Sequence, residues 1–214
     1  MSLVAATMLG FGLGVKHALE ADHLAAVCTF VARGGSVTRA AKTGALWGAG
    51  HAAVIVLAGG ALVATGASVP EPLALAFDLA VAAMLIGLGF ASLLSRRARH
   101  GHEHEHGHEH GPATSTRRPL AIGLVHGASG TAALTLLVAS TIKARVEALA
   151  FVTIFGLASV VGMAVIAALV AWPLRSVGRR APGVVRGVQA IAGAASIVAG
   201  LAVAWTTVAP AMQS

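Results

Sequence analysis

The chain has 214 residues, of which 57% are hydrophobic and only 11% charged, and its mean hydropathy is +0.82. These values exclude an ordinary soluble domain, in which about 25% of residues are charged, and make the lipid bilayer the expected solvent. The formal net charge of +7 does not indicate nucleic-acid binding, because the basic residues gather in loops rather than along a stripe with aromatic residues.

Apolar runs along the chain predict six transmembrane helices, at residues 3–32, 44–65, 73–95, 119–141, 148–173 and 184–209. Each run is long enough to cross a hydrocarbon core of about 30 Å. No basic segment precedes the first run, so we expect this helix to be retained rather than removed as a signal peptide. The predicted fold class is an all-α integral membrane protein.

The first run contains a group of ionisable residues near its middle, in the stretch KHALEADH: Lys16, His17, Glu20, Asp22 and His23. A charged side chain at a helix centre opposes membrane insertion by about 2.5–3.5 kcal/mol, so such residues usually have a function. Lys16 and Glu20 are spaced to pair with each other, which leaves Asp22 without a cation. A divalent metal ion held by Asp22 and neutral imidazoles would supply this charge. A buried structural pair is the alternative.

The spacing H-x4-D-H does not place its three side chains on one face of a straight helix. At 100° per residue, Asp22 lies about 140° and His23 about 240° around the axis from His17. Joint binding of one ion therefore predicts a kink or unwound segment between His17 and His23, made easier by the glycines within residues 10–14. Alternatively, only His17 or only the pair of Asp22 and His23 contacts the ion.

The second run adds His51, in the stretch LWGAGHAAVIV. An imidazole from a second helix would help to close a metal site, and the nearby Gly44 and Gly48 allow close helix packing. A histidine hydrogen-bonded to a backbone carbonyl is the alternative. In the third run, Asp78 lies nearer the outer face, where it either receives an arriving cation or pairs with a polar partner. The single cysteine, Cys28, excludes an internal disulfide and is interpreted as a packing residue.

Residues 96–118 interrupt the apolar pattern with a polar tract, which predicts a disordered cytoplasmic loop. Histidines alternate there with glycine and glutamate: His100, His102, His104, His106, His108 and His110. This density of imidazoles favours weak binding and buffering of transition metals such as Ni, Cu, Zn or Co, without selecting one of them. A solvated spacer is the alternative.

An offset of 109 residues relates the two halves of the chain. It carries Gly14, His17, Ala18 and Ala21 onto Gly123, His126, Gly127 and Gly130. Three helices in each half make the repeats antiparallel, so we expect two inverted three-helix repeats, at residues 1–95 and 119–214. Secondary transporters have this architecture and place their binding site near the midplane. His126, the repeat mate of His17, is therefore a further candidate ligand that lines the pathway.

The basic loop residues predict the orientation in the membrane. Those expected on one side are Arg33, Arg39, Lys42, Arg96, Arg97, Arg99, Arg117, Arg118, Arg175, Arg179, Arg180 and Arg186, whereas Lys143 and Arg145 lie on the other. The positive-inside rule places the larger set in the cytoplasm and both termini outside, in a plasma (inner) membrane of bacterial type. Tryptophans near predicted helix ends are expected to act as interfacial anchors: Trp47, Trp172 and Trp205.

Two short motifs bear on a possible protease activity, one of the rhomboid serine type and one of the zinc type. Residues 127–130 spell GASG, as in rhomboid intramembrane serine proteases, but no histidine follows His126 to act as a base for Ser129. HALEADH also lacks the H-E-x-x-H spacing of zinc proteases. We therefore expect no enzymatic activity and no cofactor, with a rhomboid-like protease as the less favoured alternative.

Several stretches resemble the nickel/cobalt transporter family. KHALEADHLAAV resembles the family's H-x4-D-H signature helix, and LWGAGHAAVIVL resembles its second, glycine-histidine motif. GLVHGASGTAAL is similar to the short, six-helix, urease-accessory-permease-like branch. The resemblance implies metal-binding roles for His17, Asp22, His23 and His51. The acidic motif of the long members has no counterpart here.

The resemblance also implies a function. The expected activity is that of a secondary permease for Ni²⁺ or, second to it, Co²⁺, with a cytoplasmic metallochaperone as a possible partner. Nickel/cobalt efflux permeases also carry a histidine-rich loop, so the direction of transport stays open. The cytoplasmic placement of that loop favours uptake.

Overall fold

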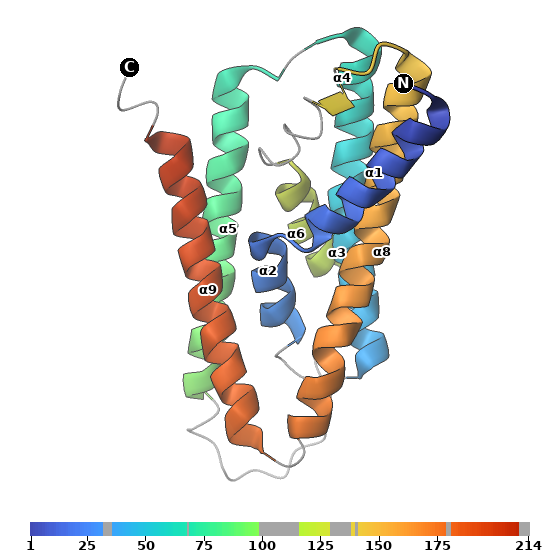
Figure 1. Ribbon diagram of the computed structural model, residues 1–214. Coiled ribbons are helices and arrows are strands. Elements are labelled where there is room, and N and C mark those ends of the chain that lie inside the picture. Colours follow the sequence, from blue (N-terminus) through green and yellow to red (C-terminus); the bar gives the residue numbers. More distant parts are fainter. Residues whose placement is uncertain are drawn as a thin grey trace.

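The computed structural model describes residues 1–31, 36–67, 69–98, 116–128, 138–139, 141–178 and 181–209. This part of the chain is almost entirely helical and contains no strand, which confirms the all-α fold class (Figure 1). The principal helices are α1 (Leu3–Ala18), α2 (Ala21–Val31), α3 (Val37–Val54), the π-helical turn η1 (Ile55–Gly59), α4 (Gly60–Thr65), α5 (Glu71–Ala98), α6 (Arg117–Gly127), α8 (Arg145–Gly178) and α9 (Pro182–Val208).

Helical segments in the described residues are long and apolar enough to cross a bilayer at Val37–Thr65, Glu71–Leu94, Arg145–Val177 and Gly183–Val208. They correspond to the second, third, fifth and sixth predicted spans, and they make the chain a multi-pass membrane protein. The other two predicted spans are not single continuous helices. The first is divided into α1 and α2, and α6 ends at Gly127. Most of the remainder of the fourth run lies outside the described residues.

The first predicted span is interrupted at Leu19 and Glu20, between α1 and α2 (Figure 1). The amides of these two residues donate to the carbonyls of Lys16 and His17, each at 3.0 Å, which tightens the last turn of α1. The carbonyl of Glu20 accepts a bond from the amide of Leu24 at 2.9 Å and so starts α2. The chain therefore changes direction with little loss of backbone hydrogen bonding.

The glycines upstream of this interruption have a different role from the one expected. Helix α1 is continuous through residues 10–14, so they do not form the kink. Instead, α1 packs along α8 with Gly14 against the backbone of Phe155. The same kind of contact joins α6 to α3, where Gly127 lies against the backbone of His51. Glycine thus brings the helix backbones close together at the contact of α1 with α8 and at the contact of α6 with α3.

The long helices surround the short α2 and α6, which lie in the middle of the molecule (Figure 1). Helix α5 packs along α9, and α3 packs against both α8 and α6. Apolar side chains from several helices close the interior, among them Val27 from α2, Leu85 from α5 and Met163 from α8. This packing holds the ends of α1, α2 and α6 at the centre of the bundle.

The tryptophans divide into two classes. Trp172 and Trp205, near the ends of α8 and α9, are 71% and 70% exposed, as expected for interfacial anchors. The prediction for Trp47 was wrong, since its side chain is fully buried. Helix α3 begins at Val37, earlier than the apolar run suggested, so Trp47 lies well inside the helix rather than at its end.

Candidate metal centre

The break between α1 and α2 brings four histidines and one aspartate together inside the bundle. His17 lies in the last turn of α1, and Asp22 and His23 lie in the first turn of α2. His51 comes from α3, and His126 comes from the last turn of α6. All four imidazoles are buried. The structure therefore collects in one place every intramembrane ligand predicted from the sequence.

Hydrogen bonds connect these side chains into one network. The Nδ1 of His23 donates to Oδ1 of Asp22 at 3.0 Å, and the Nε2 of His126 donates to Oδ2 of the same carboxylate at 3.1 Å. The Nδ1 of His17 donates to Oε2 of Glu20 at 2.9 Å. These donor assignments follow because an ionised carboxylate can only accept. They leave a lone pair on Nε2 of His17, which accepts a bond from Nε2 of His51 at 2.9 Å, and an unpartnered lone pair on Nε2 of His23.

The nitrogens that remain are suited to binding a cation. Nε2 of His17 and Nε2 of His51 share a hydrogen bond at 2.9 Å, so the two rings are already close enough to contact one ion. Nε2 of His23 and Nδ1 of His51 are buried and have no hydrogen-bond partner in the described structure. Buried polar atoms normally have a partner, and a metal ion would provide one.

The ligand atoms form two overlapping groups. His17, His23 and His51 make up the three-imidazole group, and Asp22, His23 and His126 make up the carboxylate group. Within each group the candidate ligand atoms all lie within 4.8 Å of one another. Imidazole and carboxylate are ordinary ligands of divalent first-row metals. Either group can therefore chelate a transition-metal dication.

The charge at this centre also suits a dication. With the imidazoles neutral, Asp22 carries the only charge within the two ligand groups, and Glu20 adds a second negative charge through its bond to His17. The Asp22 side chain is 15% exposed and that of Glu20 is 39% exposed. Glu20 was expected to pair with Lys16, but the described structure bonds it to His17 while Lys16 is exposed. Both carboxylates are thus available to balance one divalent ion.

Two residues of the centre were assigned other roles from the sequence. Glu20 lies three residues after His17, and this spacing places both on one side of the helix end. Trp47 lies four residues before His51 on α3, and its ring is 5.3 Å from that of His23 and 5.5 Å from that of His126. The spacing of each residue from a neighbouring histidine, three residues for Glu20 and four for Trp47, is the sequence signal by which both could have been assigned to the centre.

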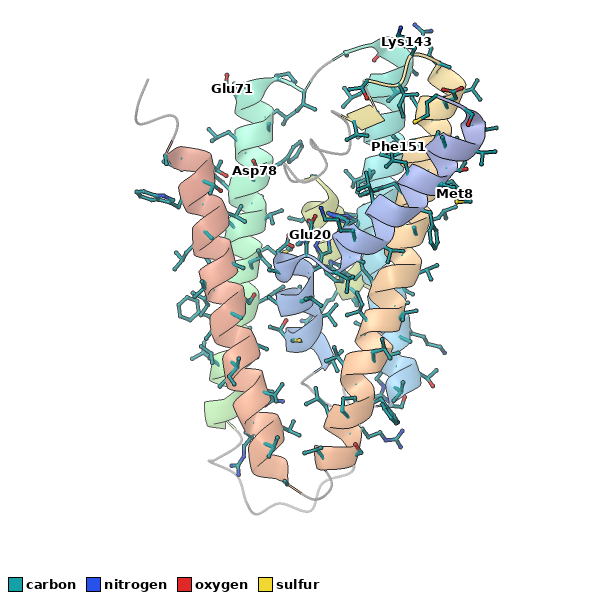
Figure 2. All side chains as sticks on the ribbon, viewed as in Figure 1. Met8, Glu20, Glu71, Asp78, Lys143 and Phe151 are labelled. Carbon is teal, nitrogen blue, oxygen red and sulfur yellow. The ribbon has the colours of Figure 1, made fainter. Side chains whose placement is uncertain are left out.

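The other candidates lie apart from this centre or outside the described residues. Asp78 is on α5, nearer the end of the molecule where the N-terminus lies, and belongs to neither ligand group (Figure 2). Figure 2 also shows Glu20 near the middle of the molecule, at the break. The loop histidines at positions 100–110 and Ser129 fall outside the described residues. Their proposed roles stay predictions.

Comparison with known proteins identifies a relative. The chain is 29% identical over 187 residues to the urease accessory protein UreH of Bacillus sp. (strain TB-90), which covers 84% of this chain and 82% of the relative. This similarity supports the resemblance to the nickel/cobalt transporter family. No family model and no solved structure matches the chain. In the described structure, the H-x4-D-H stretch spans the break between α1 and α2, and the glycine-histidine stretch adds His51 to the same centre.

Proposed function

We propose that the protein is a secondary permease for a divalent transition-metal ion, Ni²⁺ before Co²⁺, and that it works in the direction of uptake. The observation that carries the proposal is the group of buried imidazoles around Asp22, at a broken helix in the middle of a membrane bundle. Ionisable residues at this depth are expensive and mark ion pathways. Discontinuous helices at the midplane are where secondary transporters bind their ions.

The ligand types suit nickel and cobalt. The resemblance to the nickel/cobalt transporter family supplies these two metals as the candidate ions, and imidazole suits both. Mixed nitrogen and oxygen ligands, as in this centre, are also found around Ni(II). The ion is the cargo, with His17, Asp22, His23, His51 and His126 as its ligands.

The arrangement of helices supports alternating access by two inverted three-helix repeats, residues 1–95 and 119–214. Helices α3 and α8 run in opposite directions, as do α5 and α9 (Figure 1). Helix α1 packs on α8 in the way that α6 packs on α3. An exchange of the two halves carries the α1–α8 pair onto the α6–α3 pair and leaves the α3–α8 and α5–α9 pairs unchanged. Rocking of one half against the other would open the centre to each side in turn.

We place the basic helix ends in the cytoplasm of a bacterial-type cell, with both termini outside. The start of α3, which carries Arg39 and Lys42, and the end of α8, which carries Arg175, lie at one end of the molecule (Figure 1). The positive-inside rule assigns this end to the cytoplasm. A dication entering a negative interior gains about 4.6 kcal/mol per 100 mV, at about 2.3 per charge. This potential is sufficient to drive uptake.

The histidine-rich loop would then collect incoming metal in the cytoplasm, where a metallochaperone is a candidate recipient. The name of the relative, a urease accessory protein, supports supply of metal to the maturation of a cytoplasmic enzyme. We do not propose proteolysis by Ser129, because the relative is named a urease accessory protein rather than a protease and the sequence offers no histidine base after His126.

The test is radioactive nickel flux into proteoliposomes in which the orientation of the protein is known. The wild type should take up Ni²⁺ under an inside-negative potential, and Asp22→Asn should reduce that flux at least about tenfold because the only charged ligand is lost. Thr206→Ala, whose hydroxyl bonds only within α9 among the described contacts, is the matched control and should retain flux.

The other outcomes separate the alternatives. Flux that runs only out of the compartment equivalent to the cytoplasm would replace uptake by efflux. Folded wild-type protein that transports neither nickel nor cobalt in either orientation would refute the permease.

A further inference from the structure

His23 belongs to both ligand groups, and this sharing has a mechanistic consequence. We propose that the transported ion occupies two overlapping positions, one at a time, and passes between them across the His23 ring. The first position is the three-imidazole group, and the second is the carboxylate group. The inference rests on the proposed permease function, and it adds the path that the ion takes within the centre.

The geometry places His23 between the two positions. Its ring centroid is 4.4 Å from that of His17 and also 4.4 Å from that of His126, with edge-on angles of 66° and 67°. The Nδ1 edge of His23 contacts Asp22, whose other oxygen contacts His126. The Nε2 atom of His23 is buried and unpartnered. In its neutral form this ring has one lone pair, which lies on Nε2 while Nδ1 donates to Asp22. Use of the Nδ1 edge in the second position requires that proton to move to Nε2, so the ring serves one position at a time.

Charge limits the centre to one ion. Asp22 is the only carboxylate in either group, and the remaining ligands are imidazoles. Two dications would bring four positive charges next to two carboxylates, those of Asp22 and Glu20, and both ions would need His23. Like charges at such short range in a low-dielectric interior repel strongly. An ion in one position therefore excludes a second ion from the other.

The two positions also connect the two halves of the chain. His17 belongs only to the first position and His126 only to the second, and they are the repeat mates identified by the offset of 109 residues. The three-imidazole group contains only first-half ligands, whereas the carboxylate group adds the second-half ligand. Transfer across His23 therefore moves the ion from ligands of the first half of the chain to a group of ligands that includes His126 of the second half.

Binding and transport should then respond differently to single substitutions. His51→Ala removes a ligand from the first position alone, and His126→Ala removes a ligand from the second position alone. Each variant should still bind one Ni²⁺ per chain at the intact position. Each should lose transport at least about 100-fold, because the ion can no longer pass between positions. His23→Ala removes a ligand from both positions and should lose binding as well.

The experiment measures nickel binding by equilibrium dialysis and nickel flux in proteoliposomes for the wild type and these variants. X-ray absorption at the nickel edge adds a readout of the ligands. His126→Ala should show an imidazole-only environment, and His51→Ala should show two imidazoles and an oxygen ligand. Thr206→Ala is the control, and an unchanged elution profile and thermal unfolding curve establish that each variant is folded. If an alanine variant does not fold, the glutamine variant at the same position replaces it.

Several results would overturn the proposal while leaving the permease function intact. They are two nickel ions bound per wild-type chain, loss of nickel binding in either folded single variant, and near-normal flux in either one. Absence of both nickel binding and nickel flux in the wild type would instead refute the permease and the two positions together.

Discussion

Replacement of Gly14 by alanine tests whether close packing of α1 on α8 holds the metal centre in place. A Cβ atom at this position would lie 2.5 Å from the carbonyl oxygen of Phe155 and 2.8 Å from the Cβ of Ala158. The first of these contacts is to backbone, which cannot rotate away. The two helices must therefore separate by about 0.5 Å for that contact to reach 3.0 Å, the lower limit of real Cβ contacts.

Gly12, on the same helix, provides a matched control, because a Cβ there has no heavy atom within 4 Å. Both substitutions gain the helix propensity of alanine over glycine, about 1 kcal/mol, so this gain cancels in the comparison. Overpacking typically costs about 1–3 kcal/mol. We therefore expect Gly14→Ala to be about 1–3 kcal/mol less stable than Gly12→Ala. The free energy of unfolding in detergent micelles, measured by denaturant titration, provides this difference.

The same change should weaken nickel binding. His17 lies three residues beyond Gly14, or about 4.5 Å along the helix axis, so a shift of α1 moves its imidazole relative to His51. Metal–ligand distances tolerate only about 0.2 Å. We expect at least about tenfold lower nickel affinity for Gly14→Ala than for Gly12→Ala, measured by isothermal titration calorimetry. Equal stability and equal affinity in the two variants would refute the packing argument.

Further predictions concern the surroundings of the centre. Glu20→Gln should lower nickel affinity about 10–100-fold, because the carboxylate that orients His17 is lost. Glu71→Gln, at the exposed start of α5, is the control and should not change the affinity. Equal titration isotherms for the two variants would contradict the role of Glu20. Nickel at 100 times its dissociation constant should stabilise the wild type by about 2.7 kcal/mol in thermal unfolding, and a similar stabilisation of Asp22→Asn would place the ion elsewhere. Deletion of residues 100–110 should alter the rate of nickel flux without abolishing it, and complete loss would contradict a buffering role for the loop.

Hydropathy and ligand chemistry were sufficient to predict much of this molecule. The apolar runs after residue 44 located the α5, α8 and α9 spans because lipid requires long apolar helices. The angular spacing of His17, Asp22 and His23 predicted the interruption now seen between α1 and α2. His51 was a candidate because an imidazole from a second helix would help to close the site, and His126 because it is the repeat mate of His17; packing brings both to the same centre.

What could not be predicted depends on contacts between distant segments. Trp47 is an interfacial residue by its distance from the start of the apolar run, and only the longer α3 and the position of α6 bury it against His126. Lys16 and Glu20 have the spacing of an ion pair, but that spacing assumes a helix that continues past Ala18. Once α1 ends there, His17 becomes the nearer partner of Glu20.

Helices α1 and α6 both end at the metal centre, and this has an electrostatic consequence. Helix α1 ends at Ala18 and α6 ends at Gly127, so His17 and His126 both lie in final turns, at the negative ends of the helix dipoles. The aligned peptide dipoles give each such end about half a negative charge, whereas the positive start of α2 is met by Asp22. Broken helices thus contribute a negative potential inside the bilayer, which attracts cations and repels anions, in addition to the charge of Asp22.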